Sequence, residues 1–252
     1  MDVGFLISLL LIIVLIFLIF KFVKTLFKAI LISILFIFAI FIILALLVYN
    51  DVSSMRTLPS KRVMFLFIAD NKIQSGFTTI FSKEEFEPLD EKKISELQDF
   101  YDGKKYKQML SNSTKFFVFN EQAIKNSKNK IKIEEFELTN EEILTLLKSS
   151  VPISTFANTL VKKGRISEKD RMDFERELLS NTTNSEFKAR VFAIVVSETL
   201  QSDFSYLIRE YKKKNVIVYP KTPLFYLTSI IPEKLTKSFF EKPTNNSSET
   251  KR

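Results

Sequence analysis

Two long apolar stretches lie near the N-terminus, ahead of a region where apolar and polar positions alternate. Residues 5–20 are uncharged and nearly all apolar, and residues 29–49 form a second such stretch. A helix crosses the hydrocarbon core of a bilayer with about 20 residues, each rising about 1.5 Å. The pattern predicts that residues 1–50 form a membrane anchor with two transmembrane helices, over about 3–20 and 29–49. Residues 3–49 would then contact the lipid bilayer.

Three lysines separate the two apolar stretches. Lys21, Lys24 and Lys28 recur at positions i, i+3 and i+7, so they share one face if residues 21–28 are helical. We expect a helical hairpin with these lysines at its tip. A cleavable signal peptide is disfavoured, because Asp2 replaces a basic leader and no small-residue cleavage site follows the first stretch.

Two alternatives to the hairpin remain open. Residues 29–49 could be the single span, preceded by a helix that lies in the interface or contacts a partner. One continuous helix over residues 5–49 would be about 68 Å long, more than twice the thickness of the hydrocarbon core. Against the hairpin, residues 21–28 contain no Gly, Pro or Asn that would break a helix.

The positions of the cationic residues predict an orientation. Lysines at the hairpin tip lie closer to the membrane than Arg56, Lys61 and Arg62, which follow the second stretch. Cytoplasmic loops carry an excess of Lys and Arg. We therefore expect a cell-membrane protein with its tip in the cytoplasm and residues 51–252 outside.

The region after the anchor begins with a predicted strand hairpin. Residues 51–60 have the composition of a polar linker, and Val63–Ile68 is a continuous apolar run typical of a buried strand. Asp70, Asn71 and Lys72 favour a turn, after which Ile73–Phe81 resumes as a second strand with Gly76 as a possible bulge.

Further segments complete a strand-rich part over residues 61–138. Residues 115–119 and 130–136 read as two more strands, which predicts a small, mostly antiparallel sheet of three or four strands. Asp90 is placed to cap a helix whose buried face would carry Ile94, Leu97 and Tyr101.

Helical spacing dominates a second part, residues 139–241. Asn140 is expected to cap a helix over 141–148, and Ser167 with Asp170 resembles a capping box before a helix ending near Leu179. Residues 242–252 look disordered. The fold class predicted is α+β, with these further elements: helices over 187–200, 204–211 and 232–240, a strand over 216–219, and a helix opened by Thr222 and Pro223.

Composition excludes several chemistries. The chain has no Cys and no His, which excludes disulfides, thiolate nucleophiles, Ser-His-Asp triads and sites with Cys or His metal ligands. With four Gly in 252 residues it has no glycine loop that would cradle a phosphate. The sequence therefore predicts neither a cofactor nor a catalytic constellation.

A serine beyond the second apolar stretch is one candidate nucleophile. Ser54 precedes Met55, and bacterial signal peptidases place a Ser-Met nucleophile near a span with a Lys base. Lys61 and Lys72 would be the available bases here. No further motif of those enzymes is present, so an ordinary linker is the favoured interpretation. Paired carboxylates such as Glu134 with Glu135 and Glu141 with Glu142 fit solvated faces and helix starts.

A basic stretch over residues 104–132 is the second candidate site. Lys104, Lys105 and Lys107 lie among aromatic residues, a combination that can contact anionic lipid headgroups or single-stranded nucleic acid. The plainer interpretation places the aromatic residues in core strands between solvated lysines. Of these two possible partners, nucleic acid is disfavoured.

The stretches FLFIADNKIQSGF (residues 65–77) and LIREYKKKNVIVYPKTPLF (residues 207–225), with the lysine-punctuated anchor, resemble membrane-anchored proteins of small-genome archaea. That resemblance implies a family without an assigned activity and carries over no catalytic residue. We expect a tethered interaction or structural module, with protein partner and oligomeric state open. The alternatives are a membrane-tethered hydrolase with Ser/Lys or carboxylate chemistry, and a binder of anionic lipid or nucleic acid.

Overall fold

The computed structural model describes residues 3–56, 61–83, 85–128, 130–203 and 205–230. The chain divides into two compact units, Met1–Asp51 and Val52–Arg252. The predicted helix over 232–240 and the predicted disorder over 242–252 lie outside the described residues.

The N-terminal unit is one helix, α1 (Val3–Arg56). It contains a 27-residue segment, Lys21–Leu47, that is long and apolar enough to cross a membrane, and its most apolar window contains no buried residue. The expected hairpin is not seen, because the helix runs without a break through the three lysines. The absence of Gly, Pro and Asn from residues 21–28 explains this continuity. The expected linker over 51–60 is likewise helical as far as Arg56.

A five-stranded mixed sheet organises the second unit, with the strand order β3-β2-β1-β4-β7. β1 and β4 are parallel, whereas the other neighbouring pairs are antiparallel. The α+β class is confirmed, but the sheet has more strands than expected and a parallel pair at its centre. The strands are β1 (Val63–Ala69), β2 (Lys72–Ile80), β3 (Glu85–Pro88), β4 (Lys115–Asn120) and β7 (Val216–Tyr219).

The parallel pair arises from a crossover. After β3 the chain passes through α2 (Glu91–Asp102) and α3 (Tyr106–Met109) before it returns as β4 beside β1. A connection of this length is what a parallel pair requires. The predicted strand over 130–136 is instead a separate hairpin, β5 (Lys130–Ile133) and β6 (Phe136–Thr139), which turns at Glu134 with φ of 54°.

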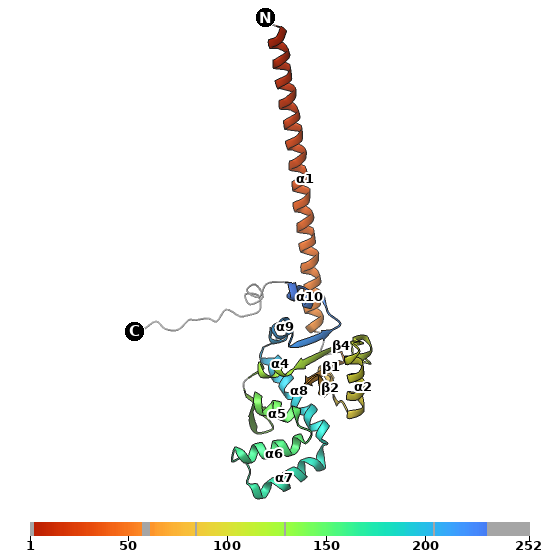
Figure 1. The fold of residues 1–252 in the computed structure, drawn as a ribbon, viewed down its shortest axis with the longest axis vertical. Helices are drawn as coiled ribbons and strands as arrows, with labels where there is room; N and C mark the ends of the chain where they lie inside the picture. The colour runs from red at the N-terminus through yellow and green to blue at the C-terminus, as the bar shows by residue number, and fades with distance from the viewer. Residues whose placement is uncertain (1–2, 57–60, 84, 129, 204, 231–252) are drawn as a thin grey trace, which may run out of the picture. The chain divides into compact units, whose positions relative to one another are not determined.

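Helices cover both faces of the sheet (Figure 1). On one face, Leu97 of α2 and Met109 of α3 pack with Met64, Leu66 and Phe116. On the other face lies α8 (Asn184–Ser202), whose aromatic side chain contacts rings from three strands: Phe192 against Phe67, Phe77 and Phe119. This two-sided cover explains why every residue of β1 is buried, as its continuous apolar run predicted.

Three further helices pack on the same side of the sheet as α8. α5 (Asn140–Lys148) and α6 (Pro152–Lys162) pack against α8, and α7 (Glu168–Asn181) packs on α6 with no buried residue. The Asp90 and Ser167 caps are confirmed, whereas Thr139 rather than Asn140 caps α5, in a reciprocal box with Glu142. The other helices are α4 (Glu121–Lys125), α9 (Ser205–Lys212) and α10 (Pro223–Ile230).

Gly76 serves close packing rather than a bulge. The irregularity between β1 and β2 falls between Phe67 and Ile68, opposite Gln74. A Cβ atom at Gly76 would lie 2.7 Å from Leu66 Cδ2 and 2.8 Å from Leu89 Cδ1. Only glycine therefore fits at this position without displacing its neighbours.

Candidate functional site

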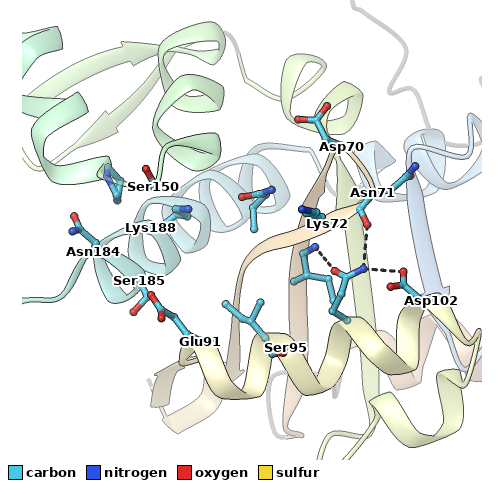
Figure 2. A pocket seen from close by; sticks show the side chains of 15 residues that line it. Asp70, Asn71, Lys72, Glu91, Ser95, Asp102, Ser150, Asn184, Ser185 and Lys188 are labelled. Carbon is cyan, nitrogen blue, oxygen red and sulfur yellow. Dashed lines mark hydrogen bonds between the residues drawn. The ribbon is translucent and has the colours of Figure 1, made fainter.

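A pocket of about 600 Å³ lies beyond the carboxyl end of β1 (Figure 2). Its walls are the β1–β2 turn, one side of α2, and the first turns of α6 and α8. The chain passes from β1 into the antiparallel β2 through this turn, and later returns as β4, the parallel neighbour on the other side of β1.

The β1–β2 turn forms one wall. Asp70 and Asn71 have φ values of 52° and 59°, which place both in the left-handed region. Two consecutive left-handed residues are what the tight hairpin turn matching strand twist requires, and Asp and Asn tolerate that conformation best. The predicted turn at these residues is confirmed.

Gln98 of α2 fastens this turn to the helix. Its side-chain oxygen accepts a hydrogen bond from the Ile73 N–H at 2.7 Å. Its nitrogen donates to the Asn71 carbonyl at 3.1 Å and to Asp102 Oδ1 at 2.8 Å. The polar groups at this end of the pocket, the Gln98 amide and the Asp102 carboxylate, are therefore already hydrogen-bonded to other protein groups.

A lysine outside the pocket compensates the charge of Asp70. Lys148 Nζ lies 3.1 Å from Asp70 Oδ2 and 3.1 Å from Glu121 Oε1. Hydrogen bonds to Glu121 and then to Asp70 raise the pKa of Lys148. The ion pair joins the end of β1 to the residue that follows β4, the two parallel strands of the sheet.

Lys188 stands at the other end of the pocket. Figure 2 shows it on α8, near Ser150, Asn184 and Ser185, with Glu91 of α2 in the wall below. Lys188 is half-buried, and this burial lowers the pKa of its ammonium group, which the carboxylate of Glu91 opposes. Within the described part of the chain, the ammonium makes no hydrogen bond or ion pair.

Asn184, one helical turn before Lys188 on α8, also lines the pocket. Its side-chain oxygen accepts a hydrogen bond from the Ile153 N–H at 3.4 Å, which joins the start of α6 to the start of α8. The side-chain nitrogen of Asn184 has no hydrogen-bond partner among the described residues. It therefore remains as a donor in the wall of the pocket.

The basic residues singled out in the sequence lie elsewhere. Lys104 and Lys105 are exposed in the loop after α2, and Lys107 is exposed in α3. None of the three lines the pocket. The stretch 104–132 is distributed over α3, β4, α4 and β5, and some of its charge is paired: Lys128 with Glu198 and Lys130 with Glu137. Its phenylalanines are buried in β4: Phe116, Phe117 and Phe119.

Of the other candidates that the structure describes, only one lines the pocket. Ser54 lies in the last turns of α1, and its side chain is outside the described ones, while Lys61 is exposed. Lys72 is exposed at the start of β2 and does line the pocket. Lys21, Lys24 and Lys28 are exposed along α1. Across the described ranges, no group of three acidic side chains is arranged to hold a metal ion.

Sequence reasoning missed Lys188 because the residue is unremarkable locally. It sits between Phe187 and Ala189 in a helix recognised by its apolar spacing. Only the packing of α2 and α6 around the start of α8 encloses its side chain. The one hint in the sequence was that Lys188 lies between two apolar residues, Phe187 and Ala189, which are both buried in the structure.

No known protein family, curated protein or solved structure matches this chain. The resemblance to archaeal membrane-anchored proteins therefore stays an expectation.

Proposed function

We propose that this protein is a membrane-anchored interaction module, in which α1 tethers the α+β unit to a bilayer. The exposed apolar surface of Lys21–Leu47 carries the proposal. The large apolar side chains described in this segment are at least 42% exposed on every side of the helix, including Ile34 at 60%, Phe36 at 67% and Phe38 at 63%. A helix that is apolar on every side belongs in a protein core or a membrane. The α+β unit would then present its pocket and surface lysines to partners near the membrane.

Energetics favour insertion of both apolar stretches. The 54-residue α1 would be about 80 Å long, against a hydrocarbon core of about 30 Å. If only residues 29–49 crossed and α1 stayed straight, residues 5–20 would extend beyond the bilayer into water. Burying a large apolar side chain gains about 1.5–3 kcal/mol, so those residues together gain on the order of 20 kcal/mol or more.

Breaking the helix costs less than this gain. Opening α1 within residues 21–28 exposes roughly four backbone hydrogen bonds to water, at about 1 kcal/mol each. We therefore infer that α1 folds into a hairpin in a bilayer, with Lys21, Lys24 and Lys28 at its tip. By the positive-inside rule the tip faces the cytoplasm and the α+β unit lies outside.

Alkaline extraction of membranes tests the anchor. The full chain should stay in the membrane pellet, whereas a variant that lacks residues 3–49 should be released. Deletion removes the whole gain of apolar burial, on the order of 20 kcal/mol or more, whereas single Asp substitutions at about 2.5–3.5 kcal/mol each would not offset it. The matched control is Met172→Asp/Leu179→Asp, which changes two exposed apolar residues of α7 and should stay in the pellet. Release of the unmodified chain would refute the anchor.

Cysteine labelling tests the hairpin, and the absence of native Cys makes it unambiguous. Single variants Asp2→Cys, Thr25→Cys and Ser180→Cys are exposed to an impermeant maleimide in sealed, oriented vesicles. The hairpin predicts that residues 2 and 180 react from one side and residue 25 from the other. Reaction of residues 2 and 25 together, opposite residue 180, would show a single crossing.

A further inference from the structure

We propose that the end of the pocket around Lys188 binds the carboxylate group of a small soluble ligand. This inference concerns the α+β unit and goes beyond membrane anchoring. It is carried by a half-buried ammonium group that faces a pocket without a hydrogen bond or ion pair from the described residues. A lysine ammonium has three donors, and burying it unpaired is costly. A bound carboxylate would supply the missing acceptor.

Neighbouring groups complete an anion site. The side-chain nitrogen of Asn184 is held in place through the bond from Ile153 to its oxygen, and it is a second donor without a partner in the described structure. Ser150 and Ser185 add hydroxyl groups on the same side of the pocket (Figure 2). The first turns of α6 and α8 also lie there, and the positive end of a helix dipole favours an anion.

The acidic residues of the pocket set the class of ligand. Asp70 is paired with Lys148, and Asp102 accepts from Gln98, so both are already engaged. Glu91 remains, and its negative charge raises the pKa of Lys188 against the larger effect of burial. The lining carries three carboxylates (Asp70, Glu91, Asp102) and two lysines (Lys72, Lys188), so each further negative charge on a ligand adds repulsion, which favours a monoanion over a dianion or polyanion. Pockets of about 300–1,000 Å³ hold small molecules, which fits the volume here.

Binding to the full chain in detergent micelles tests this site, and the result does not depend on membrane topology. Acetate is titrated by calorimetry against a background of sodium chloride at constant ionic strength, with inorganic phosphate in parallel. We expect saturable acetate binding that Lys188→Met weakens at least tenfold. The control, Lys92→Met, changes an exposed lysine of α2 that does not line the pocket and should bind as the unmodified chain does.

Three outcomes would overturn the inference: no acetate binding above the chloride background, equal binding by Lys188→Met, or binding of phosphate in place of acetate. A second measurement keeps the test decisive if Lys188→Met fails to fold. Lysines of the unmodified chain are reductively methylated with ¹³C and followed by NMR. Acetate should raise the pKa of Lys188 saturably and leave that of Lys92 unchanged, and an unchanged Lys188 would refute the site.

Discussion

The side-chain oxygen of Gln98 on α2 accepts a hydrogen bond of 2.7 Å from the backbone N–H of Ile73 on β2. Ile73 is the residue at which the strand register shifts after the turn. In the alternation of an antiparallel ladder, the N–H of Ile73 points away from β1, and it finds its partner in this helix side chain. This bond fixes the distance between the turn and α2, which are two walls of the pocket.

Replacing Gln98 should destabilise the α+β unit. Gln98→Leu leaves the N–H of the buried Ile73 and the Asn71 carbonyl without their protein partner, which costs about 1–3 kcal/mol in the free energy of unfolding. Urea denaturation measures the change. Gln122→Leu is the control, because Gln122 is exposed and makes one side-chain bond, to Asn126. Equal stability of the two variants would contradict the role given to Gln98.

A buried carboxylate holds α9 to α4. Glu210 is fully buried, and its Oε2 accepts hydrogen bonds from the side-chain amides of Asn126 at 2.8 Å and Asn215 at 2.7 Å. Glu210→Leu should cost about 3 kcal/mol or more, because two amides lose a charged partner. Glu198→Leu, which breaks the more exposed pair with Lys128, should cost at most about 1 kcal/mol. Denaturant unfolding that ranks them the other way would refute this assignment.

Gly76 should not tolerate even one added methyl group. Gly76→Ala forces the new Cβ against Leu66 and Leu89 on one side and the Phe65 carbonyl, 2.9 Å away, on the other. Overpacking of this kind costs about 1–3 kcal/mol. Gly103→Ala is the matched control, since its nearest neighbour would be 3.3 Å away. The difference in melting temperature reports the result, and a more stable Gly76→Ala would show that β2 can shift.

Lys188 should make stability depend on pH. Its pKa is lowered in the folded protein by burial, so between that value and about 10.4 the unfolded chain binds more protons. The destabilisation caused by burying the charged ammonium is fully present below the pKa of Lys188 in the folded protein. It is absent above the pKa of Lys188 in the unfolded chain. The free energy of unfolding of the native chain, relative to Lys188→Met, should therefore rise with pH and level off near pH 10.4. A relative stability that falls over this range would contradict the burial of the ammonium.

Local features of the fold were predictable from the sequence. The β1 run, the turn at Asp70 and Asn71, and the caps at Asp90 and Ser167 each depend on a few neighbouring residues. β3 was missed because its short, charged sequence reads as an acidic loop, and its strand conformation depends on pairing with β2. The parallel pairing of β1 and β4 joins segments about fifty residues apart, which no local pattern encodes.

The candidate site was less predictable than the fold. Lys188 gains its environment from Glu91 of α2 and Ser150 before α6, which are distant in sequence. The lysines at 104, 105 and 107 were candidates because they lie within four residues of one another, yet they do not line the pocket. Lysines that cluster along the sequence are therefore exposed surface residues here. The lysine that lines the pocket is instead identified by the three helices that surround it, α2, α6 and α8.

Shielding of a single residue within α1 tests the membrane anchor most directly. Ser33 lies in the second apolar stretch, and its hydroxyl bonds the Ala29 carbonyl within the helix. In the cysteine-free chain, Ser33→Cys should resist a water-soluble maleimide in intact membranes and react after detergent or unfolding, while Ser180→Cys reacts at once from its own side. Rapid labelling of Ser33→Cys in sealed membranes from either face would contradict a membrane-embedded α1.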